Sequence, residues 1–132
     1  MASIVIDTSA VVAVITDAPE KSWLIRVTHD ASLSAPSSVH WEVGNAFSAM
    51  FRRGRLSREL ITRAIDVYQM IPIRFVDVDL SASLMIAAEH RLYAYDAYLL
   101  ACARTMKAPL LTLDRPLARV ASEMGIDVLE VS

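Results

Sequence analysis

Short apolar runs alternate along the chain with segments in which apolar residues recur three or four positions apart. The runs are typical of β-strands: SIVID, the segment around Leu33, IRFVDV, LLTL and IDVLEV. The helical spacing predicts helices over residues 8–16, 20–30, 38–53, 57–71, 80–92, 95–107 and 115–124. Alternation of this kind favours a single α/β domain over residues 1–132, with a mostly parallel sheet of roughly five strands.

Two acidic residues directly follow predicted strands. Asp7 ends the first strand and Asp114 ends the fourth, so we expect both at the edge formed by the carboxyl ends of the strands. Ligands of α/β proteins bind at this edge, where the strand order reverses. Each acid is also explained as a helix N-cap, a role for which Thr8 and Ser9 are further candidates at the first helix.

Two more acids lie on predicted helices, close to their apolar stripes. Glu42 stands at the border of the stripe that includes Val39 and Val43, where a solvated glutamate is the commoner case. Asp96 shares the inward face of its helix with Leu99, unless it serves as the N-cap of that helix.

These four acids together indicate a metal site. Carboxylates gathered at one edge raise each other's pKa unless a cation neutralises them. Oxygen ligands suit Mg²⁺ or Mn²⁺, and no Cys or His cluster has the spacing of a zinc site. Enzymes use such ions to hold phosphate esters and to activate water. The leading function is therefore phosphodiester hydrolysis by a catalytic and metal-binding set of Asp7, Glu42, Asp96 and Asp114.

Composition narrows the function classes further. The chain has 132 residues, of which 55% are hydrophobic, and this content excludes a disordered protein. Its 13 basic and 15 acidic residues give a net charge of −2, which excludes a nucleic-acid binder that relies on overall positive charge. The lone Cys102 forms no disulfide within the chain, and no apolar run is long enough to span a membrane. We expect a cytoplasmic protein.

Local basic charge remains available. Without the four candidate acids, the 15 acidic residues become 11, against 13 basic ones. The segment FRRGRLSRELITR carries a local excess that suits either contact with an RNA backbone or a solubilising helical hairpin. Its basic residues are Arg52, Arg53, Arg55, Arg58 and Arg63.

Other side chains have weaker claims to a function. His40, beside Glu42, is a candidate phosphate contact, although structural roles are commoner for it and for His29 and His90. Base stacking competes with packing for Tyr93, Tyr95 and Tyr98. Cys102 and Ser3 lack the partners that nucleophilic catalysis requires.

Four strings spread over essentially the whole chain carry a family resemblance: SIVIDTSAVVAVI, HWEVGNAF, YAYDAYLLACA and LLTLDRPLA. In this order they resemble the PIN-domain ribonucleases, in particular the VapC-type toxins of toxin–antitoxin systems. The resemblance implies a three-layer α/β/α sandwich with a parallel sheet. It also implies one or two Mg²⁺ or Mn²⁺ ions, with Asp7 and Asp96 as direct ligands, Glu42 and Asp114 completing the pocket, and Thr112 and Ser9 in support.

The same resemblance implies partners. Proteins of this kind cut RNA, form dimers and are held inactive by a small antitoxin, so we expect a homodimer or a toxin–antitoxin hetero-oligomer. The alternative is a catalytically silent PIN-like or other α/β binding module. A phosphoacceptor receiver domain fits poorly, because Thr8 and Ser9 follow Asp7 and no Lys follows residue 107. A dehalogenase-type phosphatase fits poorly as well, because Ser9 stands where a second Asp is needed.

Overall fold

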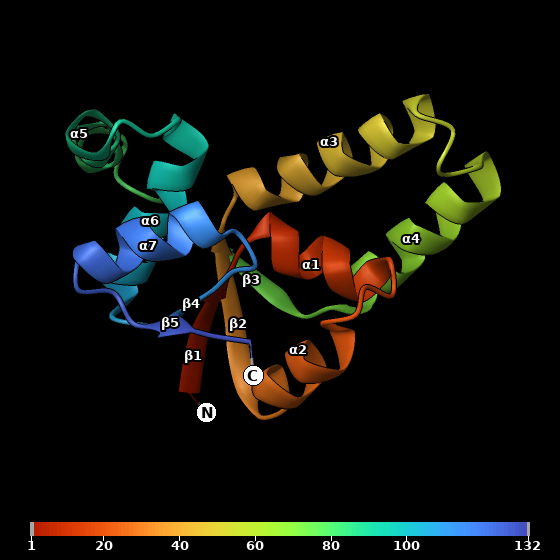
Figure 1. Cartoon of the computed structure of the whole chain (residues 1–132), viewed down its shortest axis with the longest axis horizontal. Coiled ribbons are helices and arrows are strands. Elements are labelled where there is room, and N and C mark those ends of the chain that lie inside the picture. The colour runs from red at the N-terminus through yellow and green to blue at the C-terminus, as the bar shows by residue number, and fades with distance from the viewer. Residues whose placement is uncertain (1, 132) are drawn as a thin grey trace.

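Five parallel strands form one sheet in the computed structural model, which describes residues 2–131 (Figure 1). Their order is β3-β2-β1-β4-β5, so the order reverses between the adjacent strands β1 and β4. The reversal marks the usual ligand site of an α/β fold. The strands are β1 (Ala2–Ile6), β2 (Ala31–Pro36), β3 (Ile73–Val76), β4 (Leu110–Leu111) and β5 (Val128–Leu129).

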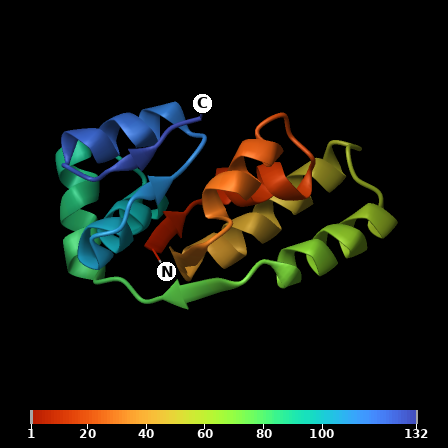
Figure 2. The same ribbon diagram turned by 90° about the horizontal axis from the view of Figure 1, so that it is seen from below.

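Helices cover both faces of this sheet. The first four helices lie to one side of it and the last three to the other (Figures 1 and 2). This arrangement confirms the expected three-layer α/β/α sandwich. The first group is α1 (Thr8–Ile15), α2 (Lys21–Thr28), α3 (Ser38–Arg52) and α4 (Arg58–Met70). The second is α5 (Leu80–His90), α6 (Ala94–Met106) and α7 (Arg115–Glu123).

The predicted elements are all present, and the differences lie at their ends. Strands β4 and β5 have only two residues each. The run LLTL pairs only at Leu110 and Leu111, and the side chain of the next residue, Thr112, donates a hydrogen bond to the Asp7 carboxylate. The N-cap of α1 is Asp7, rather than Thr8 or Ser9, since the Asp7 carboxylate accepts the Ala10 amide hydrogen bond.

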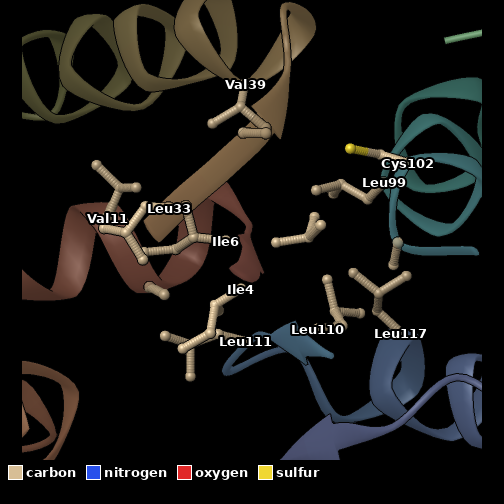
Figure 3. Packing of buried hydrophobic residues seen from close by; sticks show 14 of the residues in the cluster. Ile4, Ile6, Val11, Leu33, Val39, Leu99, Cys102, Leu110, Leu111 and Leu117 are labelled. Atoms are coloured by element: carbon tan, nitrogen blue, oxygen red, sulfur yellow. The ribbon is translucent and has the colours of Figure 1, made fainter. Parts of the chain in front are cut away.

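The core lies on both sides of β1, between the sheet and its helices. Figure 3 shows Leu110 of β4 close to Leu117 of α7, while Ile6 of β1 lies with Leu33 of β2 and Val11 of α1 on the other face of the sheet. Leu110 is completely buried, although its strand has only two residues. Apolar packing therefore fixes β4 beside β1, where the strand order reverses. No helix within residues 2–131 has the length and apolar character needed to cross a membrane.

We expect Leu110→Ala to lower the free energy of unfolding by about 2–5 kcal/mol, because it leaves a cavity in the core. Denaturant titration followed by circular dichroism measures this change. Leu84→Ala, at a position that is 48% exposed on α5, is the control and should change the free energy by less than about 1 kcal/mol. Equal losses from the two substitutions would contradict this description of the core.

Candidate active site

Asp7 is a buried carboxylate at the carboxyl end of β1. Its side chain is only 4% exposed. One oxygen, Oδ1, accepts hydrogen bonds from the Ser9 hydroxyl at 2.7 Å and from the Ala10 amide at 3.0 Å. The other oxygen, Oδ2, accepts one from the Thr112 hydroxyl. A carboxylate has about four acceptor positions, so these bonds leave Asp7 with one free.

The hydroxyls of Ser9 and Thr112 connect Asp7 to the segment that follows β4. Ser9 Oγ accepts the Leu113 amide hydrogen bond at 2.9 Å. Thr112 Oγ1 accepts the Asp114 amide hydrogen bond at 3.0 Å. Each hydroxyl thus donates to Asp7 and accepts from the backbone, which fixes its orientation. The structure places both predicted supporting residues against Asp7.

Glu42 reaches the same edge from α3. Its Oε2 accepts a hydrogen bond of 2.9 Å from the Thr8 hydroxyl, directly after Asp7 in the chain. Its Oε1 is buried and has no hydrogen-bond partner within the described part of the chain. A buried carboxylate oxygen without a partner is costly. The Glu42 side chain is therefore partly buried, whereas a solvated glutamate is the commoner case, and one of its oxygens has no partner.

Asp96 and Asp114 complete the group from the other side of the sheet. The N-cap of α6 is Tyr93, so Asp96 lies in the first helical turn and its alternative explanation as the N-cap is wrong. Asp114 is the N-cap of α7, where its Oδ1 accepts the Leu117 amide hydrogen bond at 3.1 Å. Asp114 is nevertheless exposed. It therefore caps α7 and also faces solvent at the carboxyl edge of the sheet.

The four carboxylates form a closed electrostatic ring. Burial is the main cause that raises the pKa of Asp7, and repulsion from Asp114 adds to it, against the lowering effect of its hydrogen bonds. Burial likewise raises the pKa of Glu42, with repulsion from Asp96 and Asp7. Burial and repulsion from Asp114 raise that of Asp96. Each acid is therefore within electrostatic reach of two others.

Salt bridges within the described residues do not neutralise the charge of the four acids. None of the ion pairs found in residues 2–131 includes any of the four acids. The described part of the chain also contains no group of three His, Cys, Asp or Glu side chains close enough to be a ready-made metal site. The donors themselves fit a hard cation, since all are oxygens, one of them is unpartnered and their charge is uncompensated. Binding an ion would require the four side chains to draw closer together.

The other sequence candidates lie elsewhere or serve the fold. His40 contacts aromatic rings rather than the acids. Cys102 is buried, and burial raises the pKa of its thiol to about 11, which agrees with its exclusion as a nucleophile. Tyr93 is 86% exposed, so the packing explanation is wrong for it. Tyr98 is partly buried and makes an edge contact with Tyr95.

The basic segment lies at the far end of the helical hairpin from Glu42. Its five arginines fall at the end of α3, in the turn and on α4, and all are exposed. Arg55 and Arg63 border an apolar hollow of about 490 Å³ between α1, α3 and α4. The segment is thus a solvated hairpin tip that does not reach the acids.

Two features of the site escaped the sequence analysis. Thr8 was considered only as a helix cap, whereas its hydroxyl holds Glu42. Arg115 and Arg119 line a surface hollow of about 640 Å³ that Thr112 and Asp114 also border, so positive charge adjoins the acids on the α7 side. The available signal was the pair of hydroxyl residues after Asp7, together with Arg115 directly after Asp114 and Arg119 one turn later.

Known proteins share this architecture. A family model described as the PIN domain matches residues 4–123. A crystal structure from Pyrobaculum aerophilum has a TM-score of 0.74 at 23% identity, with 96% of this chain and 83% of the other covered. VapBC2 from Rickettsia felis, bound to a DNA fragment from its promoter, has a TM-score of 0.65 at 13% identity. The match covers 96% of this chain and 97% of the other. A toxin–antitoxin complex from Klebsiella pneumoniae has a TM-score of 0.64 at 13% identity, with 98% of each chain covered. No curated protein matches the chain in sequence.

Raised carboxylate pKa values predict a stability cost that grows with pH. In the absence of divalent ions, the folded chain binds the proton of Asp96 more tightly than the unfolded chain does, so this contribution to stability is present at low pH. It is lost as the pH rises through the folded pKa, above the ordinary value of 3.8. We expect Asp96→Asn to match the wild type in free energy of unfolding at low pH and to exceed it at pH 7.

Denaturant titrations in EDTA at a series of pH values test this expectation. Asp66→Asn, at an exposed position on α4, is the control and should differ from the wild type by an amount that does not change with pH. A difference between Asp96→Asn and the wild type that is constant with pH, or that favours the wild type at pH 7, would refute the electrostatic ring.

Proposed function

The chain belongs to the PIN-domain family, and from this premise we propose that it is a divalent-metal-dependent endoribonuclease that acts as the toxin of a toxin–antitoxin pair. The observation that carries the proposal is the ring of four uncompensated carboxylates at the reversal of the strand order. Such a ring is unfavourable for folding alone. It becomes useful when a cation and a phosphate occupy the same edge.

Asp7 and Asp96 are the proposed direct ligands of Mg²⁺, for which Mn²⁺ is able to substitute. Glu42 and Asp114 complete the acidic pocket, and the unpartnered Glu42 Oε1 supports a ligand role for this residue as well. When bound, the ion lowers the pKa of water and offsets negative charge on the phosphate. Removal of the ion should therefore abolish cleavage while leaving the fold intact.

The chain's own contribution is to orient these ligands. The Asp7 carboxylate is fixed by three hydrogen bonds, which also favour its charged form despite burial. Thr8 fixes Glu42 through Oε2 and leaves Oε1 free. A protein nucleophile is not needed, and the buried Cys102 thiol is a poor one. Attack on the phosphodiester by water, in line with the leaving oxygen, is the mechanism that this arrangement favours.

The proposed partner is a cognate antitoxin protein. One structural neighbour is described as a toxin–antitoxin complex and another as VapBC2 bound to a DNA fragment from its promoter, and we extend the toxin–antitoxin assembly to the present chain as part of the proposal. Exposed apolar side chains are consistent with partner surfaces, either in a homodimer or in a toxin–antitoxin hetero-oligomer in the cytoplasm. A silent PIN-like binding module is the alternative, and it would have no need for all four acids.

Cleavage of a mixed RNA pool by the purified, antitoxin-free protein tests the activity directly. We expect cleavage with Mg²⁺ and with Mn²⁺ and none with EDTA. Asp7→Asn and Asp96→Asn should each reduce the rate by about 100-fold or more, because each removes a charged ligand. Asp66→Asn is again the control and should retain the wild-type rate. Gel analysis of labelled RNA measures all of these rates.

The outcomes separate the two candidate functions. Metal-dependent cleavage that disappears in the two site variants supports the nuclease. A folded wild type that leaves the pool intact under all conditions, in a pool that includes transfer, ribosomal and messenger RNA, would instead favour the silent binding module. Cleavage that persists in EDTA or in Asp7→Asn would overturn the assigned roles.

Thr112 offers a separate test of the positioning network. Thr112→Val keeps the size of the side chain but removes the hydroxyl that donates to Asp7 and accepts from the Asp114 amide. We expect cleavage to fall by about 10- to 100-fold, as is usual when a residue that orients a ligand is lost. Thr112→Ser should restore most of the rate. Its failure to do so, with both variants folded, would show that packing rather than the hydroxyl matters.

A further inference from the structure

An aromatic cluster holds the beginning of α3 against α4 and β3. The Nδ1 atom of His40 lies 2.9 Å from the hydroxyl oxygen of Tyr68 in α4, at hydrogen-bond distance. The imidazole also meets Phe75 of β3 edge to face, with ring centroids 5.5 Å apart at an angle of 74°. Contacts from two elements therefore fix the position of the His40 ring.

The Trp41 side chain packs against the His40 ring and is still exposed to solvent. The ring centroids of His40 and Trp41 are 4.7 Å apart at an angle of 81°, an edge-to-face geometry that aromatic pairs prefer. Yet the Trp41 side chain is 74% exposed. A large apolar ring that is held in place and left open is preorganised for a ligand, because little freedom is lost when the ligand binds.

Gly44 leaves open the space beside this ring. It lies inside the 15-residue helix α3, and nothing lies within 4 Å of the position that a Cβ would take. Neither packing within the chain nor a positive φ accounts for a glycine here, although glycine weakens a helix. Side chains on a helix lean toward its N-terminus, so a side chain at this position would project toward Trp41 and His40. Its absence keeps their rings accessible.

We propose that Trp41 is a stacking platform for a nucleobase of the RNA strand, beside the phosphate that is cleaved at the four carboxylates. This inference rests on the proposed function. Glu42 follows Trp41 directly, so the two side chains leave the same turn of α3 about 100° apart. In the proposed complex the phosphate lies on the Glu42 side of this turn, and the base of a neighbouring nucleotide stacks on Trp41. Stacking requires only an accessible π face and tolerates any base, which suits an exposed indole with no specific polar partners.

The surroundings of Trp41 favour a base over a protein partner. The residues that follow it on the same face of α3 are Gly44, Asn45, Ser48 and Arg52, none of which has a large apolar side chain. A specific protein interface buries about 800 Å² on each partner around an apolar centre. Trp41 thus has polar neighbours toward the C-terminal end of α3 and the hydrogen-bonded His40 on its other side, and this surface is too small for that role. It is well matched to one base.

Tryptophan fluorescence reports on this contact without any catalysis. The chain has two tryptophans, so Trp23→Phe leaves Trp41 as the single tryptophan, whose emission is followed with excitation selective for indole. We expect a single-stranded RNA of about six nucleotides, a length that single-strand binding modules accommodate, to quench its fluorescence saturably in EDTA. The same RNA with abasic sites should quench far less. In the native background, Trp41→Ala should weaken RNA binding by roughly 5- to 150-fold, and Trp41→Phe much less.

Gly44→Gln separates a binding role from a structural one. Glutamine is a better helix former than glycine, so the variant should be more stable, with an unfolding equilibrium constant lowered about two- to fivefold. Its side chain would cover the space beside Trp41, so RNA binding should weaken as it does in Trp41→Ala. Ser48→Gln, one turn further along the same face, is the matched control and should bind RNA like the wild type.

Each result has a distinct meaning. Metal-dependent cleavage without RNA-induced quenching, or with unchanged affinity in Trp41→Ala and Gly44→Gln, would overturn the platform and leave the proposed nuclease intact. Quenching without cleavage in Mg²⁺ would contradict the nuclease but not the contact with a base. Fluorescence that changes with protein concentration in the absence of RNA, together with loss of a dimer in Trp41→Ala, would assign this ring to a second copy of the chain instead.

Discussion

The buried carboxylate of Asp7 is the constraint around which the site is arranged. A charge that is only 4% exposed is costly unless it is hydrogen-bonded. Three donors meet this requirement: the Ala10 amide and the hydroxyls of Ser9 and Thr112. Because both hydroxyls also accept backbone amides after β4, the bonds that satisfy Asp7 determine where β4 ends and α7 begins. The reversal of strand order and the acid are thus stabilised together.

The topology then brings the other acids to Asp7. Parallel strands place all their carboxyl ends at one edge, and the helices that begin there carry the acids near their N-termini. The partial positive charge of a helix N-terminus, about half an elementary charge, favours carboxylates at this edge but does not balance four of them. Burial and mutual repulsion therefore still raise the pKa of Asp7, Glu42 and Asp96. The remaining negative charge is what a cation would neutralise.

Most of the fold could be predicted from the sequence because each element has a clear hydrophobic period and a clear end. The four acids were found in the same way, as polar residues at strand ends or on apolar stripes. The short lengths of β4 and β5 could not be predicted, because they depend on pairing with neighbouring strands. The bond from Thr112 to Asp7 closes a separation of 105 residues, which no local pattern shows. The bond from Thr8 to Glu42 spans 34 residues and was equally invisible to local patterns. Side chains that close such long loops depend on the tertiary fold.

Several features that folding alone does not explain lie at the carboxyl edge of the sheet or on α3 within two residues of Glu42. They are four carboxylates without a salt-bridge partner in residues 2–131, an unpartnered oxygen on Glu42, an exposed Trp41 and a helical Gly44 with open space around it. Each of them lowers stability or leaves a favourable contact unmade, whereas the core around β1 is conventionally packed. Natural proteins concentrate such departures where function requires them. Their shared location therefore points to a ligand-binding edge independently of the family match, and α3 contributes to it with both a charged and an aromatic side chain.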